Sequence, residues 1–78
     1  MKIWVVQYRE FGEEDQVLLC SSKEIARQRA YYLLWHILER RLQGTDTEIP
    51  NTLEQIEQLC FDEEYAYINI YEQEVDNG

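Results

Sequence analysis

Basic residues are missing from the second half of this chain. Residues 42–78 contain ten carboxylates and no Lys or Arg, whereas residues 1–41 carry all seven basic residues against six acidic ones. The formal net charge of the 78 residues is −9. So negative a chain repels the phosphate backbone of DNA and RNA and the anionic surface of a membrane, because both are bound through Lys and Arg. We therefore expect no direct binding to nucleic acid and none to a membrane.

Long apolar runs and clustered cysteines are also missing. The apolar run at residues 3–6 is too short for the core of a signal peptide or for a membrane span, so we expect a cytoplasmic protein. Cys20 and Cys60 are far apart in the sequence, and without a secretory signal they are expected to be buried free thiols rather than a disulfide. With His36 as the single histidine they are too few for a zinc site, and we expect no metal and no cofactor.

No arrangement typical of a catalytic site occurs. Three glycines do not form a glycine-rich phosphate loop, and Ser21 and Ser22 stand where a helix is expected to begin, where they would serve as caps. The acidic triplets at 13–15 and 62–64 lack the alternating ligands and central glycine of a calcium-binding loop. We predict that the chain is not an enzyme.

Hydrophobic residues make up 45% of the chain, with ten aromatic side chains, which is too many for a disordered acidic tail. We expect one folded domain, 1–78. Alternating patterns predict strands at 2–10, 16–20 and 65–75, with a turn at 11–15. A capping signal at Ser21 predicts a long helix that ends before Gly44, and a second signal at 51–54 predicts a shorter one.

The order of these elements, ββααβ, predicts an α+β fold. We expect a two-layer sandwich in which two helices cover one face of a three-stranded sheet. The strand order stays open at this point. A third strand beside the first is expected to run parallel to it, and a third strand beside the second antiparallel.

Alternation also assigns the two faces of the sheet. The side chains expected to face the helices are Trp4, Val6, Tyr8, Ala66, Ile68 and Ile70. The opposite face would then hold Ile3 and Val5 together with Tyr65, Tyr67 and Tyr71. An open aromatic face is typical of an interface, because Tyr is enriched in binding hot spots and accepts Arg in cation–π contacts.

The carboxylates predict an anionic surface. Acids at positions 72, 74 and 76 would share one side of an extended segment at a spacing of roughly 6.6–6.8 Å. The simpler interpretation is that these acids are solvated or pair with the basic helix, but nine acids stay unpaired even when all seven bases pair. The candidate partner-binding residues are Glu54, Glu57, Asp62, Glu63, Glu64, Tyr65, Tyr67, Tyr71, Glu72, Glu74 and Asp76.

Two functions from different classes follow as hypotheses. The first is a protein-binding module that occupies the basic nucleic-acid-binding site of a larger protein by resembling the phosphate backbone. Small acidic inhibitors that phages encode against host defence nucleases are similar to this chain in size and charge only, and no motif places it in a family. The second is a domain that forms a homodimer through the open sheet face or the apolar side of the first helix.

Overall fold

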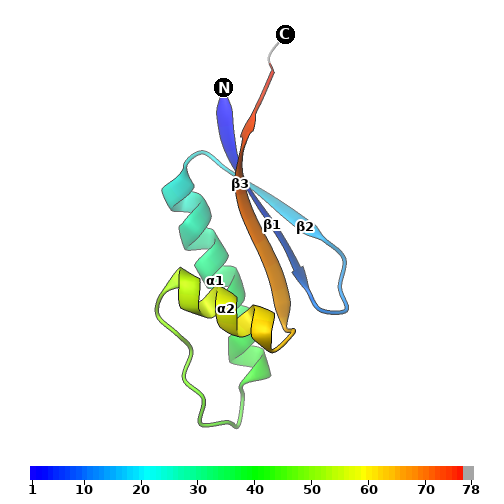
Figure 1. Ribbon diagram of the computed structural model, residues 1–78, viewed down its shortest axis with the longest axis vertical. Coiled ribbons are helices and arrows are strands. Elements are labelled where there is room, and N and C mark those ends of the chain that lie inside the picture. Colours follow the sequence, from blue (N-terminus) through cyan, green and yellow to red (C-terminus); the bar gives the residue numbers. More distant parts are fainter. Residues whose placement is uncertain (77–78) are drawn as a thin grey trace.

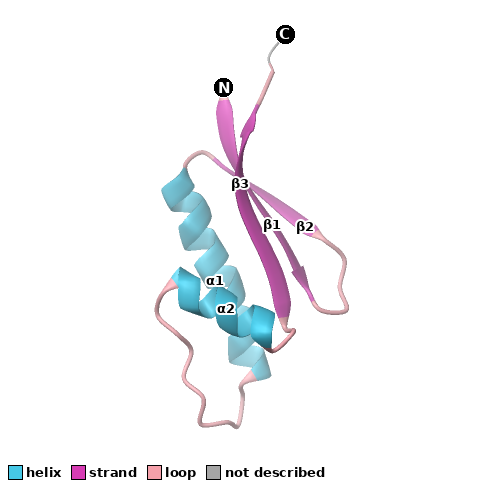
Figure 2. Cartoon of the chain, viewed as in Figure 1, coloured by secondary structure: helices cyan, strands magenta, loops and turns pink. Residues whose placement is uncertain are grey.

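The computed structural model describes residues 1–76 and confirms the expected element order (Figure 1). The elements are β1 (Lys2–Glu10), β2 (Gln16–Cys20), α1 (Lys23–Arg41), α2 (Leu53–Asp62) and β3 (Ala66–Glu74). Figure 2 shows the two layers, a three-stranded sheet with both helices on one of its faces, so the predicted α+β sandwich is confirmed. No helix among residues 1–76 is both long and apolar enough to cross a membrane.

The sheet has β1 in its centre and is antiparallel throughout. β3 pairs with β1 from Glu10↔Ala66 to Lys2↔Glu74, so the expectation that a third strand beside the first would be parallel is wrong. The reason lies in the unequal helices: α1 has 19 residues and α2 has 10, which are about 28 Å and 15 Å long. In Figure 1 the loop after α1 turns back beside it, and α2 then brings the chain to the end of the sheet where β1 ends. β3 therefore starts there and runs in the opposite direction to β1.

The core lies between the helices and the inner face of the sheet. Its fully buried members include Val6 from β1, Ala30 and Leu34 from α1, and Ile56 from α2. The partly buried Trp4, Tyr8, Ile68 and Ile70 pack against this cluster, which confirms the predicted inner face. Cys20 and Cys60 are both buried and free, as expected, and burial raises the pKa of the Cys60 thiol to about 11.

Both helices begin with a capped first turn. Thr52 caps α2 by accepting a hydrogen bond from the Gln55 amide at 3.3 Å, within the predicted signal. α1 is capped by Ser22, whose hydroxyl accepts from the Ile25 amide at 3.2 Å, and not by Ser21 as predicted. β2 continues to Cys20, so the chain needs Ser21 to leave the sheet before the helix can start.

The end of α1 is attached to the end of β1 by a shared carboxylate. Arg40 and Arg41 donate to the two oxygens of Glu10 at 2.7 and 3.3 Å, and the Glu10 side chain is 19% exposed. The hydrogen bond from Arg40 is the main reason that the pKa of Glu10 lies below its ordinary value, with a smaller effect from Arg41; partial burial opposes both. The two arginines also complement the negative end of the α1 dipole.

We predict that Glu10→Gln lowers the free energy of unfolding by about 1–2 kcal/mol near neutral pH, because the amide keeps one acceptor oxygen instead of two and has no negative charge for Arg40 and Arg41. A carboxyl group whose pKa falls on folding stabilises the fold above its ordinary pKa, and this contribution is lost as the pH falls through the lowered value. Urea unfolding of both proteins should therefore differ near pH 7 and converge in acid, once the pH is below the lowered pKa of Glu10. An equal difference near pH 7 and in acid would contradict the role of the Glu10 charge.

Candidate functional site

The candidate residues do not form one surface. Five carboxylates and Tyr67 surround α2 and the start of β3, whereas Glu72, Glu74 and Asp76 lie at or beyond the far end of β3. The distance from Ala66 to Glu72 along an extended strand is about 20 Å. The remaining tyrosines, Tyr65 and Tyr71, belong to neither group. The first group forms the candidate site.

The carboxylates at 62–64 crowd the C-terminal end of α2. This last turn contains no basic residue, and carboxylates at the negative end of a helix dipole are unfavourable. Asp62 accepts a hydrogen bond from Gln58 at 2.8 Å. Glu64 follows the C-cap with φ of 57°, in the left-handed region that suits Gly or Asn better than Glu. The acids thus occupy positions where folding alone would favour other residues.

Two phenylalanines accompany these acids. Phe11 and Phe61 are each 66% exposed, and with Glu64, Tyr67 and Arg9 they line a hollow of about 210 Å³. Arg9 lies 3.8 Å from Asp15, which balances its charge. The amide of Phe11 donates to the carbonyl of Tyr65 at 2.9 Å, which holds the β1–β2 turn beside the start of β3. That turn also contains Glu13 and Glu14. We call this set the acidic end: Phe11, Glu13, Glu14, Phe61, Asp62, Glu63 and Glu64.

Sequence reasoning missed both phenylalanines. The inward positions of α2 are Leu53, Ile56 and Cys60, and Phe61 lies outside them. An aromatic residue off the apolar stripe of a helix indicates an exposed aromatic side chain, and this signal was present in the sequence. Phe11 was assigned to a turn, where neither helical nor strand periodicity predicts how exposed a side chain is.

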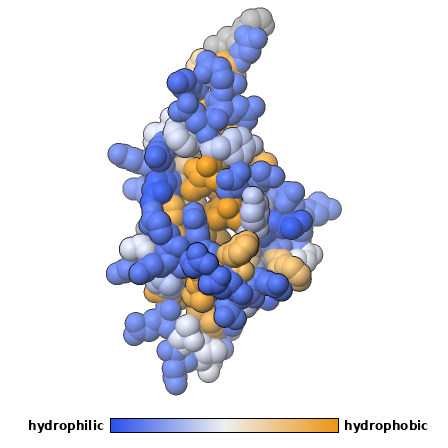
Figure 3. Space-filling model, viewed as in Figure 1, coloured by the Kyte–Doolittle hydropathy of each residue, from blue (hydrophilic) through white to orange (hydrophobic). Residues whose placement is uncertain are grey.

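A groove between α2 and β3 continues from the acidic end. It has a volume of about 380 Å³, and Phe61, Ala66 and Tyr67 line both hollows. Glu54 and Glu57 line the groove from the helix. Figure 3 shows apolar surface between α1 and β3 and over the end of α2, with hydrophilic side chains around it. The two hollows thus share the apolar side chains of Phe61, Ala66 and Tyr67, and carboxylates from Glu54, Glu57 and Glu64 line them together with Arg9.

The two groove carboxylates have opposite electrostatic environments. Arg27 of α1 donates to Glu54, and this hydrogen bond is the main reason that the pKa of Glu54 lies below its ordinary value. Glu57 is half-buried and makes no ion pair with any residue in 1–76. Burial, and then the charge of Glu54, raise the pKa of Glu57, while Arg27 opposes them. Ionised Glu57 therefore opposes folding.

We predict that Glu57→Gln leaves the free energy of unfolding near pH 7 unchanged or higher, because it removes an unfavourable charge. The pKa of Glu57 is raised on folding, so the folded protein favours the protonated side chain. Its contribution to the free energy of unfolding is therefore favourable at low pH and is lost as the pH rises through the raised pKa. The gain from Glu57→Gln should thus disappear in acid. Glu54→Gln is the matched control and should have the opposite sign at pH 7, because it breaks the contact with Arg27. Equal losses in both variants by urea unfolding would contradict this assignment.

We also predict that Glu64→Gly raises the free energy of unfolding by up to about 1 kcal/mol, because glycine adopts positive φ without strain. Glu63→Gly is the control: Glu63 has φ of −89°, so there glycine brings only its entropy cost and should destabilise. Thermal unfolding of the three proteins checks both signs. A loss of stability in Glu64→Gly would show that the Glu64 side chain itself supports the fold.

The acids at the far end of β3 are paired with the N-terminal strand. Glu72 lies 3.5 Å from the Lys2 ammonium and Glu74 lies 3.4 Å from the N-terminal amine. Asp76 follows β3 and is exposed. By their register opposite Trp4 and Lys2, Glu72 and Glu74 lie on the inner-face side of the strand, away from Tyr71. Their charge is thus partly neutralised, and they do not border the tyrosine face.

The tyrosines divide between two surfaces. Tyr67 and Tyr71 lie on the sheet face opposite the helices, as expected, and are 47% and 39% exposed. Tyr65 does not join them: it packs against the core, and the Arg41 guanidinium lies 5.4 Å from its ring centre. The predicted placement of Tyr65 is wrong because β3 begins at Ala66, so Tyr65 lies in the turn from α2 and the strand alternation does not apply to it.

Comparison with known proteins adds no further assignment. No family model, no curated protein and no solved structure matches this chain. Within residues 1–76, no group of three or more His, Cys, Asp and Glu side chains is arranged to hold a metal ion. The interpretation of the site therefore depends on its own chemistry.

Proposed function

We propose that this chain is a non-catalytic protein-binding module of the cytoplasm whose acidic end and α2–β3 groove occupy a basic nucleic-acid-binding site on a larger protein. One observation carries the proposal: the carboxylates of this surface stand where they oppose folding. Glu57 has a raised pKa, the acids at 62–64 face the negative end of a helix dipole, and Glu64 has a left-handed backbone. A binding role accounts for acids that stability does not favour.

The exposed phenylalanines support binding rather than solubility alone. A purely solubilising charged surface needs no aromatic side chains, whereas interfaces combine a desolvated apolar centre with a polar margin. Phe11 and Phe61 supply that centre beside Glu64. An arginine of a partner could stack on these rings while it pairs with a neighbouring carboxylate.

The charge of the surface favours a nucleic-acid-binding partner. Sites for DNA and RNA gather Lys and Arg that pair with phosphate oxygens, and carboxylate oxygens accept the same charge-assisted hydrogen bonds. Five of the carboxylates around α2 and the hairpin turn, Glu13, Glu14, Asp62, Glu63 and Glu64, make no ion pair with any residue in 1–76. They remain available to a basic surface.

The test is a pull-down from a lysate of the native host with the immobilised chain, at about 0.05 M and about 0.5 M salt. We expect a basic protein that is retained at low salt, released at high salt and eluted at low salt by a duplex DNA oligonucleotide. Asp62→Asn/Glu63→Gln/Glu64→Gln should reduce its retention about tenfold or more. The control Glu39→Gln/Asp46→Asn/Glu48→Gln removes the same number of charges outside the site and should retain it.

Three results would count against the proposal. Equal loss in both triple variants would indicate that net charge, and not this surface, governs binding. Retention that high salt does not weaken would contradict the electrostatic mechanism. Release by salt without competition from DNA would contradict occupation of a nucleic-acid site.

A further inference from the structure

The sheet face opposite the helices, which we call the outer face, has an unusual composition. Its side chains come from alternate positions of the three strands: Ile3, Val5, Gln7, Arg9, Val17, Leu19, Tyr67, Asn69, Tyr71 and Gln73. None of these ten residues is Asp or Glu, in a chain that has 16 of them. Arg9 lies at one margin, where Asp15 of the hairpin turn is 3.8 Å away and balances its charge. The face is therefore close to neutral.

The outer face is also apolar and uncovered. Val17 and Leu19 are 60% and 63% exposed, whereas Val5, between Leu19 and Tyr71 in the register, is 1% exposed. An antiparallel sheet with one solvated face normally places polar side chains there. Neither helix reaches this side of the sheet (Figure 1). An apolar and nearly uncharged sheet face is typical of a surface that is buried in an interface.

We infer that a second copy of this chain covers the outer face, so that two sheets pack face to face in a two-fold symmetric dimer. This inference does not depend on the function proposed above. Sheets that pack in this way lie about 10 Å apart. Two copies repel each other through their net charge of −9, and the outer face lets them meet without bringing strand carboxylates together. A basic partner would find no carboxylates to pair with on the outer face, so the face does not favour such a partner.

The size of the face suits a weak dimer. β1 and β3 have nine residues each and β2 has five, which at about 3.4 Å per residue and about 4.8 Å between strands cover roughly 375 Å² in projection, before side-chain relief is counted. Standard interfaces bury about 600–1,000 Å² of accessible surface on each partner, and smaller ones are typical of weak association. The tyrosines and leucine of the face are suited to sheet-on-sheet packing.

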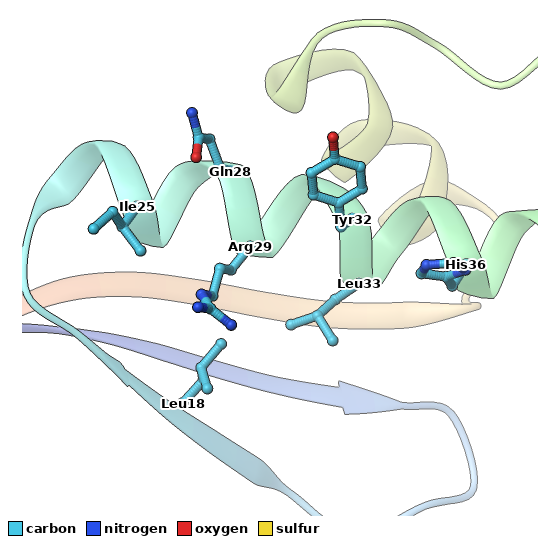
Figure 4. Close-up of a pocket in the computed structure, with 7 residues that line it drawn as sticks. All are labelled: Leu18, Ile25, Gln28, Arg29, Tyr32, Leu33 and His36. Atoms are coloured by element: carbon cyan, nitrogen blue, oxygen red, sulfur yellow. The ribbon is translucent and has the colours of Figure 1, made fainter.

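The groove between α1 and β2 is the other apolar surface through which two copies could associate. It has a volume of about 440 Å³, and in Figure 4 Arg29 and Leu33 of α1 point toward Leu18 of β2. Tyr32 lies beside it and is 62% exposed. Packing against this groove would desolvate the Arg29 guanidinium, whereas the guanidinium of the outer face, Arg9, lies at its margin beside Asp15. The groove serves as the control surface.

Sedimentation analysis of the full chain between about 5 and 500 µM tests the dimer, because its population depends on concentration. Gln7→Glu places a carboxylate in the middle strand of the outer face, and Gln28→Glu adds the same charge in the α1–β2 groove. We expect a wild-type dimer that Gln7→Glu weakens at least about tenfold and Gln28→Glu leaves unchanged within about twofold. Leu19→Ser, which removes an exposed apolar side chain, should weaken it in the same direction and covers the case that Gln7→Glu does not fold.

Salt gives a second criterion. Screening reduces the repulsion between two acidic copies, so the dimer should become tighter between about 0.05 M and 0.5 M salt, opposite to the binding of a basic partner. A wild-type monomer at all concentrations would overturn the inference. Retention of the dimer in Gln7→Glu and Leu19→Ser, or its loss in Gln28→Glu alone, would also overturn it by placing the contact elsewhere.

Discussion

The pairing of β1 with β3 is the constraint on which the rest of the structure depends. β1 is bonded on both sides, and its neighbouring residues Val5 and Val6 are almost fully buried although they point to opposite faces. Because side chains alternate along a strand, a slip of one residue would exchange the two faces. The observed register places Tyr71 opposite Val5 and Ile70 opposite Val6. It therefore determines which side chains enter the core and which remain on the outer face.

The same register separates charge from apolar surface. On β3 the carboxylates at 72 and 74 share the alternation of Ile68 and Ile70, while the odd positions carry tyrosines and amides. Five acids that make no ion pair within residues 1–76 belong instead to the acidic end: Glu13, Glu14, Asp62, Glu63 and Glu64. The molecule thus has two surfaces of different chemistry. The two proposed interactions should respond to salt in opposite directions, because screening weakens attraction to a basic partner and reduces repulsion between like-charged copies.

Local patterns in the sequence were sufficient to predict the elements and the inner face of the sheet. The predicted strands at 2–10 and 16–20 agree with β1 and β2, and Val6 and Ile68 face the helices as their alternation indicates. The direction of β3 could not be predicted, because it depends on how the loop and α2 return along α1 in space. The predicted placement of Tyr65 is wrong for a related reason. Strand alternation does not apply to residue 65, because β3 begins one residue later, at Ala66. Phe11 and Phe61 are 50 residues apart and line the same hollow only through the tertiary fold, which no local pattern predicts.

The two proposed surfaces meet at Arg9 and Tyr67, which belong to both, and they are also coupled through charge. Each copy adds its own −9 to a dimer, so self-repulsion opposes the packing of the outer faces even though those faces hold no strand carboxylates. A basic partner that binds the acidic end neutralises part of that charge and so favours the dimer. By linkage, the dimer then favours the partner to the same extent. A dimer also presents two acidic ends, and a partner with a second basic site in reach would gain from both at once. On both proposals together, the neutral outer face and the acidic end act as complementary surfaces, and a bound partner would stabilise carboxylates that weaken the isolated domain.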